Sequence, residues 1–248
     1  MKILVCISHV PDTTSKIKFT SDGHSLDKDG VQFVINPYDE FGLTKALQLK
    51  EEHGGVVSVI TFGDSDVEQT LRKALAIGAD DAYRLDGVPN DGIQTSQELA
   101  FFIKENEFDL IICGQESIDY NGGIVPGALA ANLNLPFINA CIGLEINDNV
   151  ANTVRETDGG KETASANLPI IIAGKKGLVE EKELRIPNMR GIMTARSKTL
   201  KVIELSGAKS LSESISFSAP PEKKAVKIIS SENIEELVRL LNEESKVI

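Results

Sequence analysis

The segment that decides the fold reads Leu110-Ile111-Ile112-Cys113-Gly114-Gln115-Glu116-Ser117-Ile118-Asp119-Tyr120-Asn121-Gly122-Gly123-Ile124-Val125-Pro126-Gly127-Ala128. An apolar run, a polar loop and a stretch of small residues predict a strand, a loop and the start of a helix. Gly122 and Gly123 leave the first backbone N–H groups of that helix uncovered, and these groups together with the helix dipole attract a phosphate. The segment alone is equally compatible with an ordinary strand-to-helix turn.

Two carboxylates in this loop narrow the kind of anion that it could hold. Glu116 and Asp119 would repel a bare phosphate, but they suit hydrogen bonds to the hydroxyl groups of a ribose. The loop therefore favours a nucleoside phosphate over inorganic phosphate.

The composition is that of a globular protein with enough chain for a full core. The 248 residues are 41% apolar and 25% charged, and the formal net charge is −11. This length fits one large domain, or one domain with an arm. The acidic balance lacks the positive charge expected of a nucleic-acid binder.

The chain shows no signal for membrane insertion, disulfides or metal catalysis. No apolar run approaches the roughly 20 residues of a membrane span, and we expect a cytoplasmic protein. The cysteines are three, without CxxC spacing, and the histidines are scattered, so neither a disulfide framework nor a metal site is predicted. GxSxG, HExxH and GxxxxGK[ST] motifs are missing, and we expect no covalent or metal-dependent catalysis.

The first half of the chain alternates strand-length apolar runs with amphipathic helical patterns. Strands are predicted at residues 2–7, 56–62, 81–85 and 109–113. Helices are predicted at 40–53, after a capping box at 65–68 and after a second box at 95–98. This alternation predicts an α/β fold with a parallel twisted sheet and flanking helices.

Hairpins and an arm complete the predicted architecture. Residues 16–19 and 31–35 are expected to form a β-hairpin excursion. Residues 152–156 and 162–166 should form a second hairpin around Asp158-Gly159-Gly160, followed by a buried strand at 170–173. Residues 1–205 then make one α/β domain. Residues 206–248 make a linker and an amphipathic helix from Ser231, which packs on its own domain or on another subunit.

Several further strand ends carry candidate ligand-binding residues. His9 follows the first strand, where it could touch a nucleotide or serve only as a loop residue. In Asn36-Pro37-Tyr38-Asp39, Asp39 can cap the next helix and Asn36 can bond a ligand edge. Phe62 could lie near an adenine ring or simply pack in the core. Together these strand ends point to one crevice.

The ordered blocks of the chain resemble the β subunit of electron transfer flavoprotein, including its Fix-type and bifurcating relatives. The resemblance covers residues 1 to about 205 and is carried by the following blocks: KILVCISHVPDT, NPYDEFGLTKALQLKE, VSVITFGDSDVEQTLRKALAIGADDAYRL, DLIICGQESIDYNGG, VRETDGGKETASANLP and RIPNMRGIMTARSK. Several blocks in the family's order are far more specific than a single glycine loop.

The resemblance implies a fold like adenine-nucleotide α-hydrolase domains and a heterodimer with an α subunit that holds FAD. The β subunit would bind AMP, or a second FAD as in bifurcating relatives. Carried over by position, the pocket comprises Cys6, Asn36, Pro37, Tyr38, Asp39, Phe62, Gly114, Gln115, Glu116, Ser117, Ile118, Asp119, Tyr120, Asn121, Gly122, Gly123, Ile124 and Val125, beside His9 at the end of the first strand. Residues 120–124 depart from the family's usual polar pattern, so phosphate contacts would depend more on backbone N–H groups. The motif at 11–13 favours FAD.

The resemblance also implies a docking loop at residues 185–194 for acyl-CoA or other dehydrogenases. Its contact residues would be Arg185, Ile186, Met189 and Arg190, with Met189 as the apolar anchor. The alternative is that Met189 and Met193 pack on their own domain. Arg155 matches a family arginine that would stabilise a reduced flavin.

Two functions remain in competition at this point. The first is a redox carrier subunit that binds an adenylate, scaffolds the flavin of the α subunit and performs no bond-breaking chemistry, with or without a part in electron bifurcation. The second is a stand-alone nucleotide-binding domain of the stress-protein type. The hairpin at 152–166 and the C-terminal arm favour the first.

Overall fold

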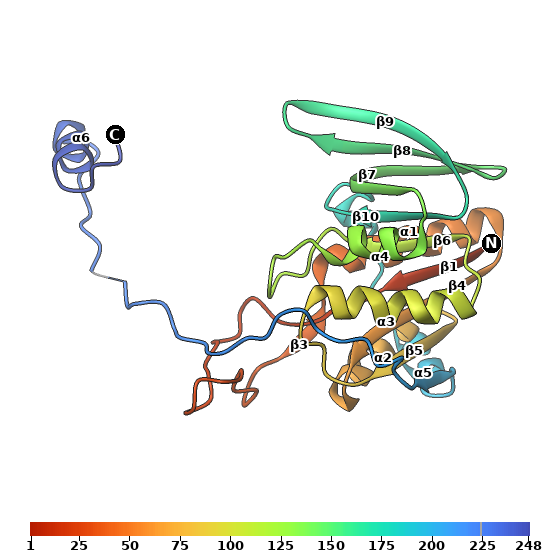
Figure 1. Ribbon diagram of the computed structural model, residues 1–248. Helices are drawn as coiled ribbons and strands as arrows, with labels where there is room; N and C mark the ends of the chain where they lie inside the picture. Colours follow the sequence, from red (N-terminus) through yellow and green to blue (C-terminus); the bar gives the residue numbers. More distant parts are fainter. Residues whose placement is uncertain (224) are drawn as a thin grey trace.

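The computed structural model describes residues 1–223 and 225–248, and its centre is a nine-stranded sheet (Figure 1). The spatial order is β11 (Leu200–Ile203), β5 (Asp81–Asp86), β4 (Val56–Gly63), β1 (Lys2–Cys6), β6 (Leu110–Gly114), β10 (Ile170–Gly174), β7 (Phe137–Asn147), β8 (Val150–Thr157) and β9 (Gly160–Asn167). The strands from β11 to β7 pair in parallel, and β8 and β9 extend the sheet antiparallel. The predicted α/β class and the hairpin at Asp158-Gly159-Gly160 are confirmed.

Helices cover both faces of the parallel part. On one face lie α1 (Pro37–His53), α2 (Glu68–Ile77) and α5 (Met189–Ala195), and on the other lie α3 (Gly92–Glu105) and α4 (Val125–Leu133). Short 3-10 turns stand at Ser65–Val67 and Glu181–Glu183. No helix among the described residues combines the length and apolar content that a membrane crossing requires.

The apolar runs of the central strands are explained by burial on both faces. Successive side chains of a strand point to opposite sides of the sheet, so Ile111 packs toward α3 and α4 while its neighbours Leu110 and Ile112 pack toward α1 and α2. All three are fully buried. Continuous rather than alternating hydrophobicity is therefore what the parallel sheet requires.

The excursion after β1 differs from the predicted hairpin in its pairing. The antiparallel partner of β3 (Phe33–Ile35) is β2 (His9–Pro11), which follows β1 almost directly. Residues 16–19 form no strand; only Phe19 makes an isolated bridge, to Leu26. The predicted strand at 16–19 was wrong because turn signals within the excursion outweighed its weak β propensity.

Two helices begin at different residues from those predicted by the capping boxes. Before the 3-10 turn that leads into α2, the side chain of Asp64 accepts the backbone N–H of Asp66. Before α3, the side chain of Asp91 accepts the backbone N–H of Gln94. The prediction that the helices begin at the capping boxes 65–68 and 95–98 was therefore wrong. In each case an aspartate nearer the N-terminus, itself a strong N-cap residue, is the cap.

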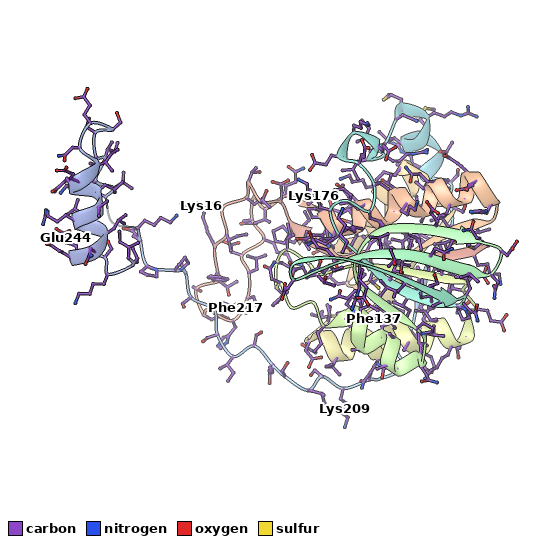
Figure 2. All side chains as sticks on the ribbon, turned by 90° about the horizontal axis from the view of Figure 1, so that it is seen from above. Lys16, Phe137, Lys176, Lys209, Phe217 and Glu244 are labelled. Atoms are coloured by element: carbon purple, nitrogen blue, oxygen red, sulfur yellow. The ribbon has the colours of Figure 1, made fainter. Side chains whose placement is uncertain are left out.

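The C-terminal arm leaves the domain in an extended conformation and ends in α6 (Ile234–Glu243), which stands apart from the sheet (Figure 1). Its early part stays close to the domain. Phe217 lies beside the excursion, where its ring stacks on Phe19 at a centroid distance of 5.4 Å (Figure 2). The helix begins three residues after the predicted Ser231, capped by Asn233. Its unpartnered apolar face comprises Ile234, Leu237 and Val238.

The central strand β6 is the first place to test this packing. Replacing Ile111 by alanine removes a fully buried side chain, and we expect a loss of about 2–5 kcal/mol in the free energy of unfolding in urea. The control Ile228→Ala removes a side chain that is 89% exposed and should change this free energy by less than about 0.5 kcal/mol. Equal effects of the two substitutions would contradict the assigned layers.

Candidate functional site

A cleft of about 630 Å³ opens at the carboxyl ends of β1, β4 and β6. Open parallel sheets hold their ligands at this edge, and the volume lies in the range of small-molecule sites. The predicted residues that line it are Cys6, His9, Asp39, Phe62, Gly114, Glu116, Ser117, Asp119, Tyr120, Gly122, Gly123, Ile124 and Val125. Strand ends far apart in the sequence thus meet at one cavity, as expected.

Other predicted residues do not line the cleft, namely Asn36, Pro37, Tyr38, Gln115, Ile118 and Asn121. The best defined of them is Asn36, which is fully buried. Its Nδ2 donates to the backbone oxygen of Glu116 at 2.9 Å, and its Oδ1 accepts the N–H of Ile118 at 3.2 Å. The amide of Asn36 therefore shapes the loop, rather than meeting a ligand edge directly.

Asp39 does not cap α1 as predicted, because it lies inside the first turn with its carboxyl group directed at β1 and β6. It is 2% exposed, and Oδ2 accepts the backbone N–H of Ser8 at 2.7 Å. The glycine at position 114 is needed here, since a Cβ atom there would lie 2.2 Å from Asp39 Oδ1. Burial raises the pKa of Asp39 to about 7, although hydrogen bonds from Ser8 act in the opposite direction.

This raised pKa gives a pH-dependent stability with a defined sign. The folded chain holds the proton of Asp39 more tightly than the unfolded chain, whose aspartates have a pKa of about 4, so the group destabilises the fold as the pH rises from about 4 to about 7. The free energy of unfolding of Asp39→Asn minus that of the wild type should therefore rise by up to about 4 kcal/mol between pH 4 and pH 8.

Urea unfolding at a series of pH values measures this difference. The control Asp29→Asn replaces an exposed aspartate and should show the same difference at every pH. A flat profile for Asp39→Asn would contradict a buried, proton-binding carboxyl group.

The glycine loop presents main-chain donors to the cleft. Among the described residues, no hydrogen bond uses the backbone N–H of Gly122, Gly123 or Ile124. Gly123 has a φ of +59° and Ile124 is right-handed, and this change of hand turns successive N–H groups toward one point. The loop leads directly into α4, whose N-terminus adds its dipole.

The charged side chains around the cleft are mostly acidic. Asp39, Asp64, Asp91, Glu116 and Asp119 line it, whereas Lys28 is the single lysine or arginine among its described lining residues. The Nζ atom of Lys28 is already paired, at 2.7 Å with Asp66 and at 3.7 Å with Asp64. Main-chain amides are therefore the principal groups here that can neutralise an anion.

His9 lines the cleft together with Phe33 of β3. Its ring stacks on Phe33 at 4.3 Å and its Nδ1 bonds Thr70 Oγ1 at 2.7 Å, while the buried Nε2 atom has no partner among the described residues. Burial and then Lys28 lower the pKa of His9. The imidazole is thus kept neutral and can exchange one hydrogen bond with a ligand.

One further wall of the cleft was not predicted from the sequence. It consists of residues 88–92 and Thr95 at the start of α3, together with Ser212 and Ser214 of the arm. No local motif marks these residues as ligand-binding. The one available signal was Asp91, a strong helix-capping type placed directly before a glycine.

The predicted docking residues form an exposed surface, and one of them, Arg185, is also ion-paired. Ile186 is 81% exposed and Met189 is 77% exposed. Met193 is exposed too, so the alternative in which the two methionines pack on their own domain is wrong. Arg185 is held by a two-pronged ion pair with Glu51, at 2.8 and 2.7 Å.

Arg155 lies outside the cleft, on β8. Its Nε donates to Glu162 on the neighbouring β9 at 2.6 Å, and its side chain is 39% exposed. Within this chain the guanidinium therefore stabilises the antiparallel extension, and its role beside a flavin stays a prediction.

Known proteins share the sequence pattern of this chain over most of its length. Residues 24–208 match the model of the electron transfer flavoprotein domain. The chain is 36% identical to the electron transfer flavoprotein subunit beta of Bacillus subtilis, over the full length of both proteins. The chain belongs to the electron transfer flavoprotein β-subunit family.

Other relatives of the family carry the same name. The subunit beta of Syntrophomonas wolfei is 34% identical, with 91% of this chain and 88% of the relative covered. That of Megasphaera elsdenii is 30% identical, with 90% and 85% covered. The chain is thus an electron-transfer flavoprotein component, and the stand-alone stress-protein alternative is not favoured. The Fix-type branch is not distinguished by these relatives.

Proposed function

We propose that the cleft binds an adenine nucleotide, AMP or FAD, with its phosphate on the amides of residues 122–124. The observation that carries this proposal is the set of main-chain donors at the N-terminus of α4 that have no partner among the described residues, in a cleft whose described lining offers no free cation. Helix N-termini and glycine nests bind phosphate in this way. The surrounding carboxylates suit the hydroxyl groups of a ribose.

The acidic lining also restricts which nucleotide fits. Each additional phosphate would bring more negative charge toward Asp64, Asp91 and Asp119, and the part of the lining that the structure describes has no free lysine or arginine to neutralise it. A nucleotide monophosphate, or a dinucleotide whose phosphates are each singly charged, fits this field better than ATP. Between AMP and FAD, the resemblance at residues 11–13 favours FAD, and a second flavin would allow a part in electron bifurcation.

Gly123 gives a direct test of the phosphate site. At its φ of +59°, alanine costs about 1–2 kcal/mol and shifts the amides out of line. We expect Gly123→Ala to retain at least about fivefold less nucleotide on purification, measured by extraction and chromatography. The control Gly159→Ala imposes similar strain at a φ of +86° in a hairpin turn outside the cleft lining and should keep its nucleotide. Equal nucleotide content in the two variants would refute the site.

The family assignment leads us to propose a heterodimer with an α subunit that holds FAD. The apolar face of α6 is exposed at the end of the arm, with Ile234 at 64% and Val238 at 49%. A helix on a linker with such a face requires a second surface, and we assign it to the α subunit. The chain would then scaffold the flavin of that subunit and carry electrons without bond-breaking chemistry of its own.

We further propose that residues 186–193 dock partner dehydrogenases, acyl-CoA dehydrogenases among them. α5 is fixed to α2 by close backbone packing, since a Cβ atom at Gly191 would lie 2.2 Å from Ala76 O. The exposed side chains of Ile186, Met189 and Met193 therefore project from a firm base. Flexible thioethers can adapt to more than one partner pocket.

This surface predicts a kinetic effect without a structural one. In the heterodimer, Ile186→Ser with Met189→Ser should slow electron transfer from a partner dehydrogenase by about tenfold at subsaturating concentration, because the apolar anchors are lost. Nucleotide content and melting temperature should not change. The control Ile17→Ser removes a partly exposed isoleucine from the excursion, and its rate should match the wild type. A normal rate in the double variant would place docking elsewhere.

A further inference from the structure

The start of the C-terminal arm is fixed to α3 by a buried carboxylate. Glu98 is 1% exposed and accepts three backbone N–H groups, from Ser206 at 2.7 Å, Gly207 at 3.1 Å and Ala208 at 2.7 Å. The φ of +89° at Gly207 allows these N–H groups to converge. Main-chain donors thus satisfy the charge of Glu98, and they specify where the arm begins.

A second carboxylate, about two helical turns before Glu98, holds the arm nearer the cleft. Asp91 Oδ1 caps α3 by accepting the N–H of Gln94 at 2.7 Å. Its Oδ2 accepts the N–H groups of Leu211 at 2.6 Å and Ser212 at 2.8 Å. These bonds lower the pKa of Asp91. One side chain therefore joins the helix cap and the arm.

These anchors bring the arm to the wall of the cleft. Ser212 and Ser214 line it beside Asp91, Gly92 and Thr95. The hydroxyl group of Ser212 donates to Asp91 at 3.2 Å, which leaves its lone pairs available as acceptors, while Ser214 makes no hydrogen bond with the described residues. Two hydroxyl groups of the arm are therefore placed to meet a ligand.

We propose that Ser212 and Ser214 are part of the nucleotide site, so that the bound nucleotide and the docked arm stabilise each other. The inference rests on the nucleotide site proposed above. A ligand that contacts the arm binds its docked state more tightly, and by linkage the docked arm raises the affinity for the ligand by the same factor. Occupancy of the cleft would thereby fix the path of the arm that leads to α6.

The arm is suited to such coupling because few apolar contacts hold it. Its attachments over residues 206–217 are mainly hydrogen bonds between its backbone and the side chains of Glu98, Asp91 and Gln94, apart from the stacking of Phe217 on Phe19. Segments of this kind open locally at small cost in free energy. Contacts with a nucleotide would therefore change the docked fraction measurably.

Calorimetric titration of the full chain, with its α subunit where the two co-purify, tests the proposal with AMP and then FAD as probes. Ser212→Ala with Ser214→Ala should weaken binding by about five- to tenfold. The matched control, Ser216→Ala with Ser218→Ala, changes exposed arm serines outside the cleft lining and should bind like the wild type. Unchanged affinity in the first variant overturns the inference and leaves the nucleotide site intact.

Limited proteolysis gives an independent readout. Saturating AMP or FAD should slow cleavage within residues 206–223 of the wild type by at least about threefold, and Glu98→Gln should reduce this protection because its side chain presents donors to the arm's N–H groups. If Glu98→Gln does not fold, the protection of the arm by nucleotide is instead compared between the wild type and the variant with Ser212→Ala and Ser214→Ala. Cleavage at the same rate with and without nucleotide overturns the coupling. A wild type that binds neither probe overturns the nucleotide site itself.

Discussion

The buried carboxyl group of Asp39 is the constraint on which the cleft depends. It accepts the N–H that follows β1, touches the glycine that ends β6 and belongs to the first turn of α1. The carboxyl group of Asp39 therefore fixes how closely β1, β6 and α1 approach one another. At this spacing only glycine, which has no Cβ atom, fits at position 114. Because the strand ends are held in this way, the loop after β6 is directed across the cleft, with Asn36 bonding it from behind.

The charge distribution favours the proposed binding of a phosphate through the backbone of the loop. A net charge of −11 and the side chains of Asp64, Asp91, Glu116 and Asp119 around the cleft would repel phosphate unless fixed donors stood against it. Side-chain cations are either absent from the described lining or already paired, as Lys28 is. Unpaired amides at a helix N-terminus supply positive potential without a lysine or arginine. In the proposed site, the glycines at 122 and 123 would take the place of the basic residues that other phosphate sites use.

Much of the fold could be predicted because the central strands are buried on both faces of the sheet. The runs at 110–112 and 170–172 are apolar at every position, which only a sheet covered on both faces explains. β7 and β11 escaped prediction since one is partly exposed and broken by Gly143 and the other is a short edge strand. The pairing of β2 with β3 depends on long-range packing, which leaves little local signal.

The part of the site that lies at the strand ends could be predicted from the sequence, whereas the wall that the C-terminal arm forms could not. Cys6, Phe62 and the loop from Gly114 lie where the parallel sheet places them. The arm's wall was missed because Glu98 and Asp91 recognise backbone N–H groups, which every residue but proline carries. Such contacts select a chain path, not a residue type, so sequence patterns cannot reveal them.

The most direct test of the central claim is a two-dimensional amide spectrum of the isotopically labelled full chain, titrated with AMP from the nucleotide-free state. The account predicts that the largest shifts fall on the amides of Gly122, Gly123 and Ile124, moving downfield as their N–H groups bond the phosphate. Shifts confined to other surfaces, with these three amides unmoved at saturation, would contradict it.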